Sequence, residues 1–219
     1  MQARQTLQPR RSVVLAESDS LEERLGVHPH RLGHVIDVLA PAEAVDAAPE
    51  LAEVFVSAFG APGYDEDRAD AERFATEQLP VHAERDDFKL VAARSDGRIV
   101  GFAYGFTGQR GQWWPDRVAA VVPAELAEEW IGGHFEVVEL AVAVGAQRQG
   151  LGTALMDALM TGLPHRKALL STYVDDRPAP RLYQRMGWQL LVPDLGWGSA
   201  LYGLDRTMPA AAGPGRVGA

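Results

Sequence analysis

Cysteine is absent from the 219-residue sequence. Its absence excludes disulfides, thiolate nucleophiles and cysteine-ligated metal sites. The sequence also lacks an apolar run of roughly 18 to 20 residues, the length that a membrane span requires. The arginines near the N-terminus precede no apolar stretch of the kind found in secretory signals. We therefore expect a cytoplasmic protein without a membrane partner.

Positive charge is scarce, since 21 Lys and Arg side chains oppose 30 acidic ones and the net charge is −9 at pH 7. Nucleic-acid binding relies on Lys and Arg that neutralise phosphates, so we predict no nucleic-acid partner. A cationic small molecule or a peptide amine suits the acidic balance better. His28, His30 and His34 resemble a metal cluster, but Pro29 breaks their helical spacing. No metal site is predicted.

The chain is long enough for one large domain, and apolar residues make up 47% of it, which is enough for a substantial core. Residues 1–30 show no apolar periodicity and are expected to form a disordered or loosely attached arm. Residues 31–207 carry the folded domain. Residues 208–219 are rich in Pro, Gly and Ala and are expected to form a flexible tail.

The periodicity of apolar residues predicts a mixed α/β (α+β) domain. Runs of β-branched and apolar residues predict strands at 35–39, 88–93, 99–106, 136–144, 168–174, 188–192 and 199–204. Helical spacing predicts helices at 47–59, 68–79, 150–163 and 179–186, the second of them ended by Pro80. Segment 108–133 is predicted to be an irregular insert with one short helical piece. Because a helix separates strands 136–144 and 168–174, these two strands are expected to run parallel.

The turn between strand 136–144 and the following helix is the most informative segment. Gly150 and Gly152 open the helix, where backbone N–H groups lack internal partners and the helix dipole adds positive potential. Such a turn is suited to a phosphate or diphosphate. It is not a dinucleotide fingerprint, because the sixth residue from Gly150 is Leu155, and no Gly-Lys-Ser/Thr sequence indicates a Walker loop.

Three segments resemble the GNAT superfamily of N-acetyltransferases. The turn Gln147-Arg148-Gln149-Gly150-Leu151-Gly152 is similar to that family's Gln/Arg-x-x-Gly-x-Gly/Ala signature, which holds the diphosphate of coenzyme A. The segment 182–188, Leu-Tyr-Gln-Arg-Met-Gly-Trp, is similar to its Leu-Tyr-x-x-x-Gly-Phe closing segment, and 140–144 matches its Leu-x-Val strand. The resemblance implies a single GNAT-like domain with a central twisted mixed sheet of about six to seven strands flanked by helices.

The resemblance also implies acetyl-CoA or another acyl-CoA as co-substrate, with no metal. Its pantetheine arm would lie along the strand before the turn, and its diphosphate would lie against the turn. Where family members often carry Asn before the Leu-Tyr pair, this chain has Asp176, which puts the role of that Asn in doubt. The implied cofactor-binding residues are Leu140, Ala141, Val142, Gln147, Arg148, Gln149, Gly150, Leu151, Gly152, Thr153 and Asp176.

Two glutamates in the apolar strand are candidates for the base that deprotonates the acceptor amine, because desolvation raises the pKa of a carboxyl group. Simple alternation places Glu136 and Glu139 on opposite faces of the sheet. Glu136 matches the base of histone-type family members, whereas Glu139 lies closer to the implied thioester. We favour Glu139 and keep Glu136 as the alternative. Tyr183 matches the family's general acid, although a tyrosine here also suits packing of the helix on the sheet.

The predicted function is therefore transfer of an acetyl or other short acyl group from acyl-CoA to a primary amine of a small molecule or peptide. The alternatives are a non-catalytic acyl-CoA sensor or protein-interaction domain, and a turn that binds another phosphate ligand. The acceptor is not identified by any motif; Trp113 and Trp114, or Phe59 and Tyr64, would line its pocket. A homodimer is possible.

Overall fold

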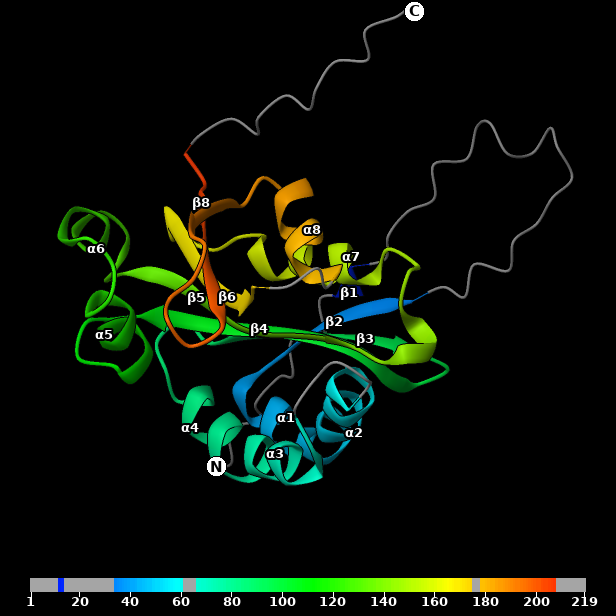
Figure 1. The fold of residues 1–219 in the computed structure, drawn as a ribbon. Coiled ribbons are helices and arrows are strands. Elements are labelled where there is room, and N and C mark those ends of the chain that lie inside the picture. Colours follow the sequence, from blue (N-terminus) through cyan, green and yellow to red (C-terminus); the bar gives the residue numbers. More distant parts are fainter. Residues whose placement is uncertain (1–11, 14–33, 61–65, 175–177, 208–219) are drawn as a thin grey trace, which may run out of the picture.

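The computed structural model describes residues 12–13, 34–60, 66–174 and 178–207, which form one central sheet with helices on both faces (Figure 1). Apart from Ser12 and Val13, the expected N-terminal arm and C-terminal tail lie outside the described residues, as do His28, His30, Tyr64 and Asp176. Among the described helices, none combines the length and the hydropathy needed to cross a membrane.

The sheet has eight strands in the order β1-β2-β3-β4-β5-β6-β8-β7. All neighbouring strands are antiparallel except β5 and β6, which are parallel as the intervening helix predicts. The mixed fold class is confirmed. The strands are β1 (Ser12–Val13), β2 (Val35–Leu39), β3 (Lys89–Ser95), β4 (Arg98–Gly108), β5 (His134–Val142), β6 (Lys167–Tyr173), β7 (Gln189–Val192) and β8 (Ser199–Asp205).

The helical segments are α1 (Pro41–Asp46), α2 (Ala48–Phe59), α3 (Arg68–Arg73), the π-helical turn η1 (Phe74–Gln78), α4 (Leu79–Ala83), α5 (Trp113–Ala119), α6 (Ala124–Trp130), the 3-10 turn η2 (Val144–Ala146), α7 (Leu151–Met160) and α8 (Pro178–Arg185). The prediction that Pro80 ends a helix is wrong. Pro80 lies in the first turn of α4, directly after the π-helical turn η1, and the helical chain continues through it without a break. The insert holds two helices, α5 and α6, rather than one short piece.

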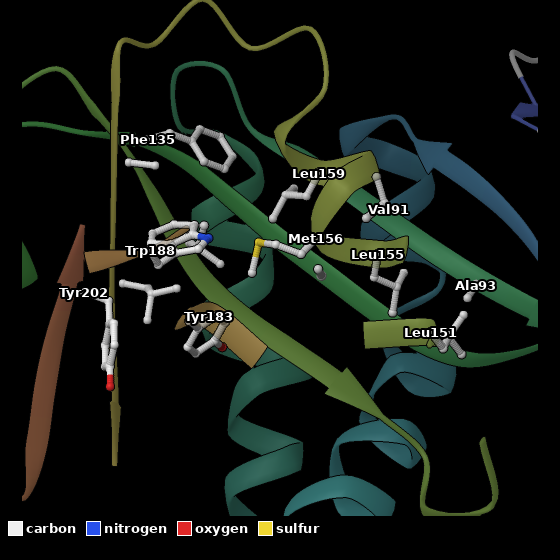
Figure 2. Packing of buried hydrophobic residues seen from close by; sticks show 14 of the residues in the cluster. Val91, Ala93, Phe135, Leu151, Leu155, Met156, Leu159, Tyr183, Trp188 and Tyr202 are labelled. Carbon is white, nitrogen blue, oxygen red and sulfur yellow. The ribbon is translucent and has the colours of Figure 1, made fainter. Parts of the chain in front are cut away.

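The two faces of the sheet have separate cores. Helices α7 and α8 cover one face, where Val91, Phe135, Leu155 and Tyr202 are buried together (Figure 2). Helices α1 to α4 cover β2 to β5 on the other face. The α5–α6 insert covers β6 and β8, and its core includes Leu169 of β6. Leu169 pairs with Glu136 of β5, and Glu136 pairs with Phe106 of β4. Because paired residues share a face, the insert lies on the same second face as α1 to α4.

A β-bulge in β5 changes which side chains share a face. Tyr104 pairs with Glu139 while the next residue, Gly105, pairs with Val137, so β5 has one residue more than β4 at this point. Cross-strand partners share a face, and partners of Glu139 and Glu136 are Tyr104 and Phe106, two residues apart on β4. Both glutamates therefore lie on the face of Tyr104. The expectation of opposite faces is wrong because a bulge interrupts the alternation.

Strands β5 and β6 separate soon after they meet. Only Phe135–Ala168 and Glu136–Leu169 are paired. Beyond Glu136, the backbone of β5 has no ladder partner on the β6 side among the described residues. The strand edge that follows includes Glu139 and leads directly to the turn before α7.

Gly105 makes the bulge possible, and its replacement should be costly. An added Cβ at this position would lie 2.2 Å from the backbone oxygen of Glu136 and 2.7 Å from the ring of Phe135. We expect Gly105→Ala to lower the free energy of unfolding by at least about 2 kcal/mol in urea titrations. Gly145→Ala is the matched control, because nothing lies within 4 Å of its added Cβ. A near-wild-type Gly105→Ala would contradict this account of the bulge.

Candidate active site

The turn between β5 and α7 is held by its own side chains. Gln147 Nε2 donates to the Val142 carbonyl at 2.9 Å, and Gln149 Nε2 donates to the Gly145 carbonyl at 3.3 Å. Arg148 and Gly150 both adopt left-handed backbone conformations, with φ of 60° and 81°. The backbone N–H of Val144 donates to the Ser57 hydroxyl at 3.1 Å and so joins the turn to α2.

The first turn of α7 is open to an anion. Its N-cap residue, Gly150, makes no side-chain capping bond, so the N–H groups of Leu151, Gly152 and Thr153 have no intrahelical acceptor. No heavy atom outside the neighbouring residues lies within 4 Å of a Cβ built on Gly150. A Cβ on Gly152 would contact Leu182 of α8 at 3.4 Å. The predicted residues 147–153 therefore surround one exposed, electropositive helix start.

The far end of α7 is neutralised by cations. Lys89 Nζ donates to the carbonyls of Ala158 (2.7 Å), Leu159 (2.9 Å) and Thr161 (2.7 Å). Arg206 donates to the carbonyl of Met160 at 3.1 Å. These contacts satisfy the carbonyl groups that a helix C-terminus leaves open and match the negative end of its dipole. Protein groups thus cap the C-terminal end of α7, whereas its N-cap residue makes no capping bond among the described residues.

The three predicted pantetheine contacts, Leu140, Ala141 and Val142, lie on β5 beyond its last pair with β6. Ala141 is buried, and the other two are partly buried. This stretch of strand edge leads without interruption into the 147–153 turn. The structure therefore places the two predicted parts of the cofactor site next to each other.

Both candidate bases are poorly solvated carboxyl groups. Glu136 is 7% exposed, and one of its carboxylate oxygens, Oε2, has no hydrogen-bond partner among the described residues. Burial raises the pKa of Glu136 to about 8, although the charge of Arg85 opposes the rise. Glu139 is partly exposed, and burial, with a smaller contribution from the charge of Glu66, raises its pKa to about 8.

A buried phenol lies beside both glutamates. Tyr104 is fully buried, and its hydroxyl lies 2.9 Å from Nδ1 of His82. Burial raises the pKa of Tyr104 well above its usual value, and the charges of Glu139 and Glu136 add to the rise. Burial lowers the pKa of His82 to about 4, with help from Arg85. The histidine is therefore neutral at physiological pH and supplies no cation to the glutamates.

Tyr183, the candidate acid, lies on the other face of the sheet. It is 7% exposed, and its ring centroid is 6.0 Å from those of Trp188 and Tyr202 in the core beneath α8 (Figure 2). The structure therefore brings Glu136 and Glu139 together but does not bring Tyr183 to their face. The glutamates and Tyr183 could act on one substrate only from opposite sides of the sheet, at the place where β5 and β6 separate.

Sequence reasoning missed several polar residues of the second face. The hydroxyl of Tyr173, at the end of β6, donates to Glu66 Oε1, which precedes α3. Trp114 Nε1 donates to the Ser171 hydroxyl of β6 at 3.3 Å. Trp113 instead is 72% exposed. The spacing of Ser171 and Tyr173 on a strand could have placed them on one face, but no signal in the sequence links either one to Glu66 or Trp114.

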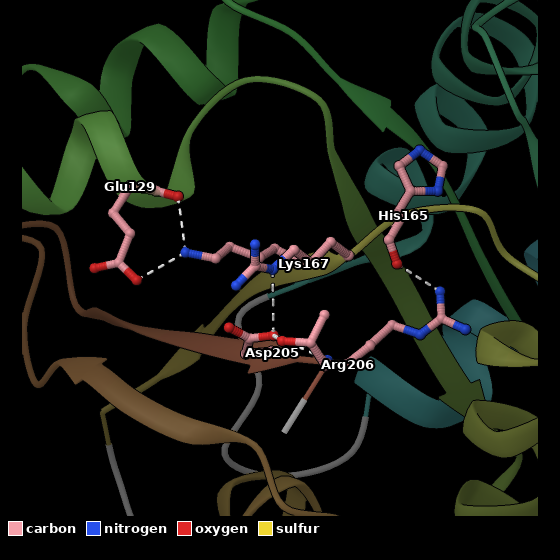
Figure 3. Close-up of polar contacts among 7 residues, drawn as sticks. Glu129, His165, Lys167, Asp205 and Arg206 are labelled. Atoms are coloured by element: carbon pink, nitrogen blue, oxygen red, sulfur yellow. Dashed lines mark hydrogen bonds and ion pairs between the residues drawn. The ribbon is translucent and has the colours of Figure 1, made fainter. Parts of the chain in front are cut away.

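A hollow of about 400 Å³ lies at the opposite end of β5 and β6, lined by Trp130, His134 and Lys167 among others. Lys167 Nζ already donates to the carbonyl (2.9 Å) and carboxylate (2.8 Å) of Glu129 (Figure 3). It also lies 4.4 Å from the centroid of the Trp130 ring. None of the predicted site residues lines this hollow, so it is separate from the candidate active site.

Comparison with known proteins places this geometry in a family context. A profile described as the acetyltransferase (GNAT) family matches residues 48–188, more than half of the 219 residues. A GCN5-like protein acetyltransferase of Mycobacterium tuberculosis is 35% identical over 105 residues, which cover 44% of this chain and 51% of that protein. The matched region thus spans about half the length of this curated relative.

Solved structures share the fold at low sequence identity. An acetyltransferase from Thermus thermophilus is 17% identical, with a TM-score of 0.55 over 77% of this chain and 96% of that chain. The PaiA N-acetyltransferase from Thermoplasma acidophilum, in complex with coenzyme A, is 12% identical, with a TM-score of 0.54 over 78% and 98% of the two chains. These likenesses establish the arrangement of the strands and helices.

Glu136→Gln should make the stability of the protein less dependent on pH. The folded chain holds the Glu136 proton up to about pH 8, whereas the reference carboxyl group releases it at a pKa of 4.5. The stability that the folded state gains from this bound proton is fully present below the reference pKa of 4.5. It is lost as the pH rises toward the folded-state pKa of about 8, by up to about 1.4 kcal/mol per pH unit.

Urea titrations between about pH 5 and 9 measure this slope. We expect Glu136→Gln to flatten it, while Glu53→Gln, at an exposed site bonded to Arg68, keeps the wild-type slope. Equal slopes for wild type and Glu136→Gln would contradict the raised pKa.

Proposed function

Because the chain belongs to the GNAT acetyltransferase family, whose members transfer acyl groups from acyl-CoA, we propose that it acylates a primary amine of a small molecule or peptide. The observation that carries this proposal is the left-handed turn at Gly150, which opens an uncapped helix immediately beyond the free edge of β5. The acyl group is an acetyl or another short chain.

The turn is proposed to hold the diphosphate of acyl-CoA. The N–H groups at the start of α7 face open space at Gly150 and favour an anion. Arg148 adds a positive charge next to them. The coenzyme A complex of the Thermoplasma relative, which shares this fold, supports the assignment. Residues 140–142 present a strand edge along which the pantetheine arm would extend.

Glu139 is the proposed base. When bound, acyl-CoA supplies a thioester whose carbonyl carbon accepts the amine. Glu139 takes the proton from the acceptor ammonium, so that the nitrogen can form the new bond to that carbon as the carbon–sulfur bond breaks. The Glu139 residue as a whole is partly exposed, and the pKa of about 8 that burial gives its carboxyl group is close to the value that suits a base near neutral pH. Glu136, on the same face but buried, is the alternative.

Tyr183 is the proposed acid, acting from the other face of the sheet. Its hydroxyl would give a proton to the departing thiolate of coenzyme A, a role that a phenol can fill, and the second proton that the nitrogen must lose to become an amide would restore the phenol. Its neighbour Leu182 lies near the start of α7, 3.4 Å from the place that a Cβ on Gly152 would take, and this position supports the role. Asp176, in the segment before α8, is kept as a proposed cofactor contact that lies outside the described residues.

Calorimetric titration with acetyl-CoA tests the cofactor site. We expect a dissociation constant of about 1 to 100 μM for the wild type and a loss of at least about 100-fold in Gly150→Glu, which places a bulky anion at the diphosphate site. Gly150→Asn is the control for backbone strain, since Asn tolerates the left-handed conformation, and should bind within about tenfold of wild type.

The result also separates the alternative functions. Binding by the wild type together with release of free thiol in the presence of amines supports an acyltransferase. Binding without turnover of any amine would favour an acyl-CoA sensor or interaction domain. A folded wild-type protein that does not bind acetyl-CoA would overturn the acyltransferase proposal.

Kinetics of Glu139→Gln test the base. We expect kcat/KM to fall by about 100- to 10,000-fold. The wild-type kcat/KM should rise with pH up to about 8 as Glu139 loses its proton, and the variant should lack this rise. Glu136→Gln is the comparison and should lose less. A larger loss in Glu136→Gln, together with the missing rise, would assign the base to Glu136 instead.

A further inference from the structure

The contact between Glu66 and Tyr173 joins two distant parts of the second face. Glu66 precedes α3, and Tyr173 ends β6. Glu66 Oε1 accepts the Tyr173 hydroxyl, whereas Glu66 Oε2 is buried and has no partner among the described residues. The next residue, Asp67, caps α3 by accepting from the N–H groups of Ala69 (2.7 Å) and Asp70 (3.0 Å). The residue that follows Glu66 is therefore held at the start of α3.

Glu66 completes a set of three carboxyl groups on one face. Tyr173 and Leu169 are four residues apart on β6 and share a face, and Leu169 pairs with Glu136. The charge of Glu66 reaches Glu139, because it contributes to the raised pKa of that group. Glu136, nine-tenths buried on this face, also has one oxygen without a hydrogen-bond partner in the described part of the chain. Two separate orphaned oxygens thus belong to the same face.

No cation of the described residues forms an ion pair with this set, although the charge of Arg85 acts on Glu136 from a greater distance. None of the ion pairs formed by the described residues includes Glu66, Glu136 or Glu139. An ionised carboxylate that is buried without a partner is costly, so a positively charged ligand on this face would stabilise the ionised forms. Aromatic residues accompany the carboxyl groups: Tyr104 pairs with Glu139, and Tyr173 bonds Glu66. Carboxylates and aromatic rings together favour ammonium groups.

We propose that Glu66, held by Tyr173, binds a second ammonium group of the acceptor, so that the preferred acceptor is a small diamine or polyamine. One amine of the acceptor would be acylated beside Glu139 while another pairs with the free oxygen of Glu66. This assignment rests on the proposed function and adds the class of acceptor to it. It gives Glu66 and Tyr173 a role in specificity rather than in the chemical step.

A matched pair of acceptors tests the second charge. 1,4-Diaminobutane and butylamine have the same chain length and differ in one ammonium group. With the wild type, we expect a kcat/KM for the diamine about 10- to 100-fold above that for the monoamine, the value of one charge-assisted hydrogen bond. In Glu66→Gln, which can still accept the Tyr173 hydroxyl, this preference should fall below about threefold, because kcat/KM for the diamine falls much more than kcat/KM for butylamine.

Two variants control the result. Glu53→Gln removes an exposed carboxylate near the same helices and should keep the wild-type preference. Tyr173→Phe, which releases Glu66, should reduce the preference without abolishing butylamine turnover. A wild type that does not discriminate between the two amines would overturn the inference. Equal losses for both amines in a folded Glu66→Gln protein would overturn it as well, because they would mean a purely structural role.

Calorimetry with 1,4-diaminobutane alone separates this inference from the proposed function. Diamine binding that weakens at least about tenfold in Glu66→Gln supports the recognition role even if acetyl-CoA neither binds nor turns over, which would sink only the acyltransferase proposal. A wild type that acylates monoamines but does not bind or favour the diamine overturns the inference and leaves the acyltransferase proposal intact.

Discussion

The parallel pairing of β5 with β6, limited to two residue pairs, is the constraint on which the rest of the site depends. Strands that stayed paired would satisfy the backbone of β5 and close the sheet between its two faces. Because they separate after Glu136, the edge of β5 next to the start of α7 has no ladder partner among the residues that the structure describes. The turn at 147–153, the candidate bases and Tyr183 can serve one reaction only because this edge is open.

The bulge at Val138 of β5 is the second feature, after the separation of β5 from β6, on which the candidate site depends. It turns Glu136 and Glu139 toward one face, where they meet Tyr104 and Glu66. The bulge needs Gly105, whose missing side chain lets β4 approach the backbone of Glu136. The extra residue in β5 and the missing side chain at Gly105 of β4 thus place Glu136 and Glu139 on one face. In a strand with regular alternation they would lie on opposite faces.

Local patterns in the sequence predicted the elements well because each depends on nearby residues. The glycines of the turn, the apolar run of β5 and the helical face of α7 are examples, and the family resemblance confirmed by the profile match rested on them. Features that depend on pairing between distant segments were not predictable. Alternation gave the wrong faces for Glu136 and Glu139, since a bulge has no local signature here. The predicted helix end at Pro80 is wrong, and nothing in the sequence links Glu66 to Tyr173.

The raised pKa values of Glu136 and Glu139 give the second face a property of its own. Near neutral pH these groups are mostly protonated, so the face stores protons rather than negative charge. An ammonium ion that enters would stabilise the ionised carboxylates and expel their protons to the solvent. Ligand uptake on this face would then be an exchange of one cation for another, almost neutral in total charge, and the medium would register each binding event as a release of acid.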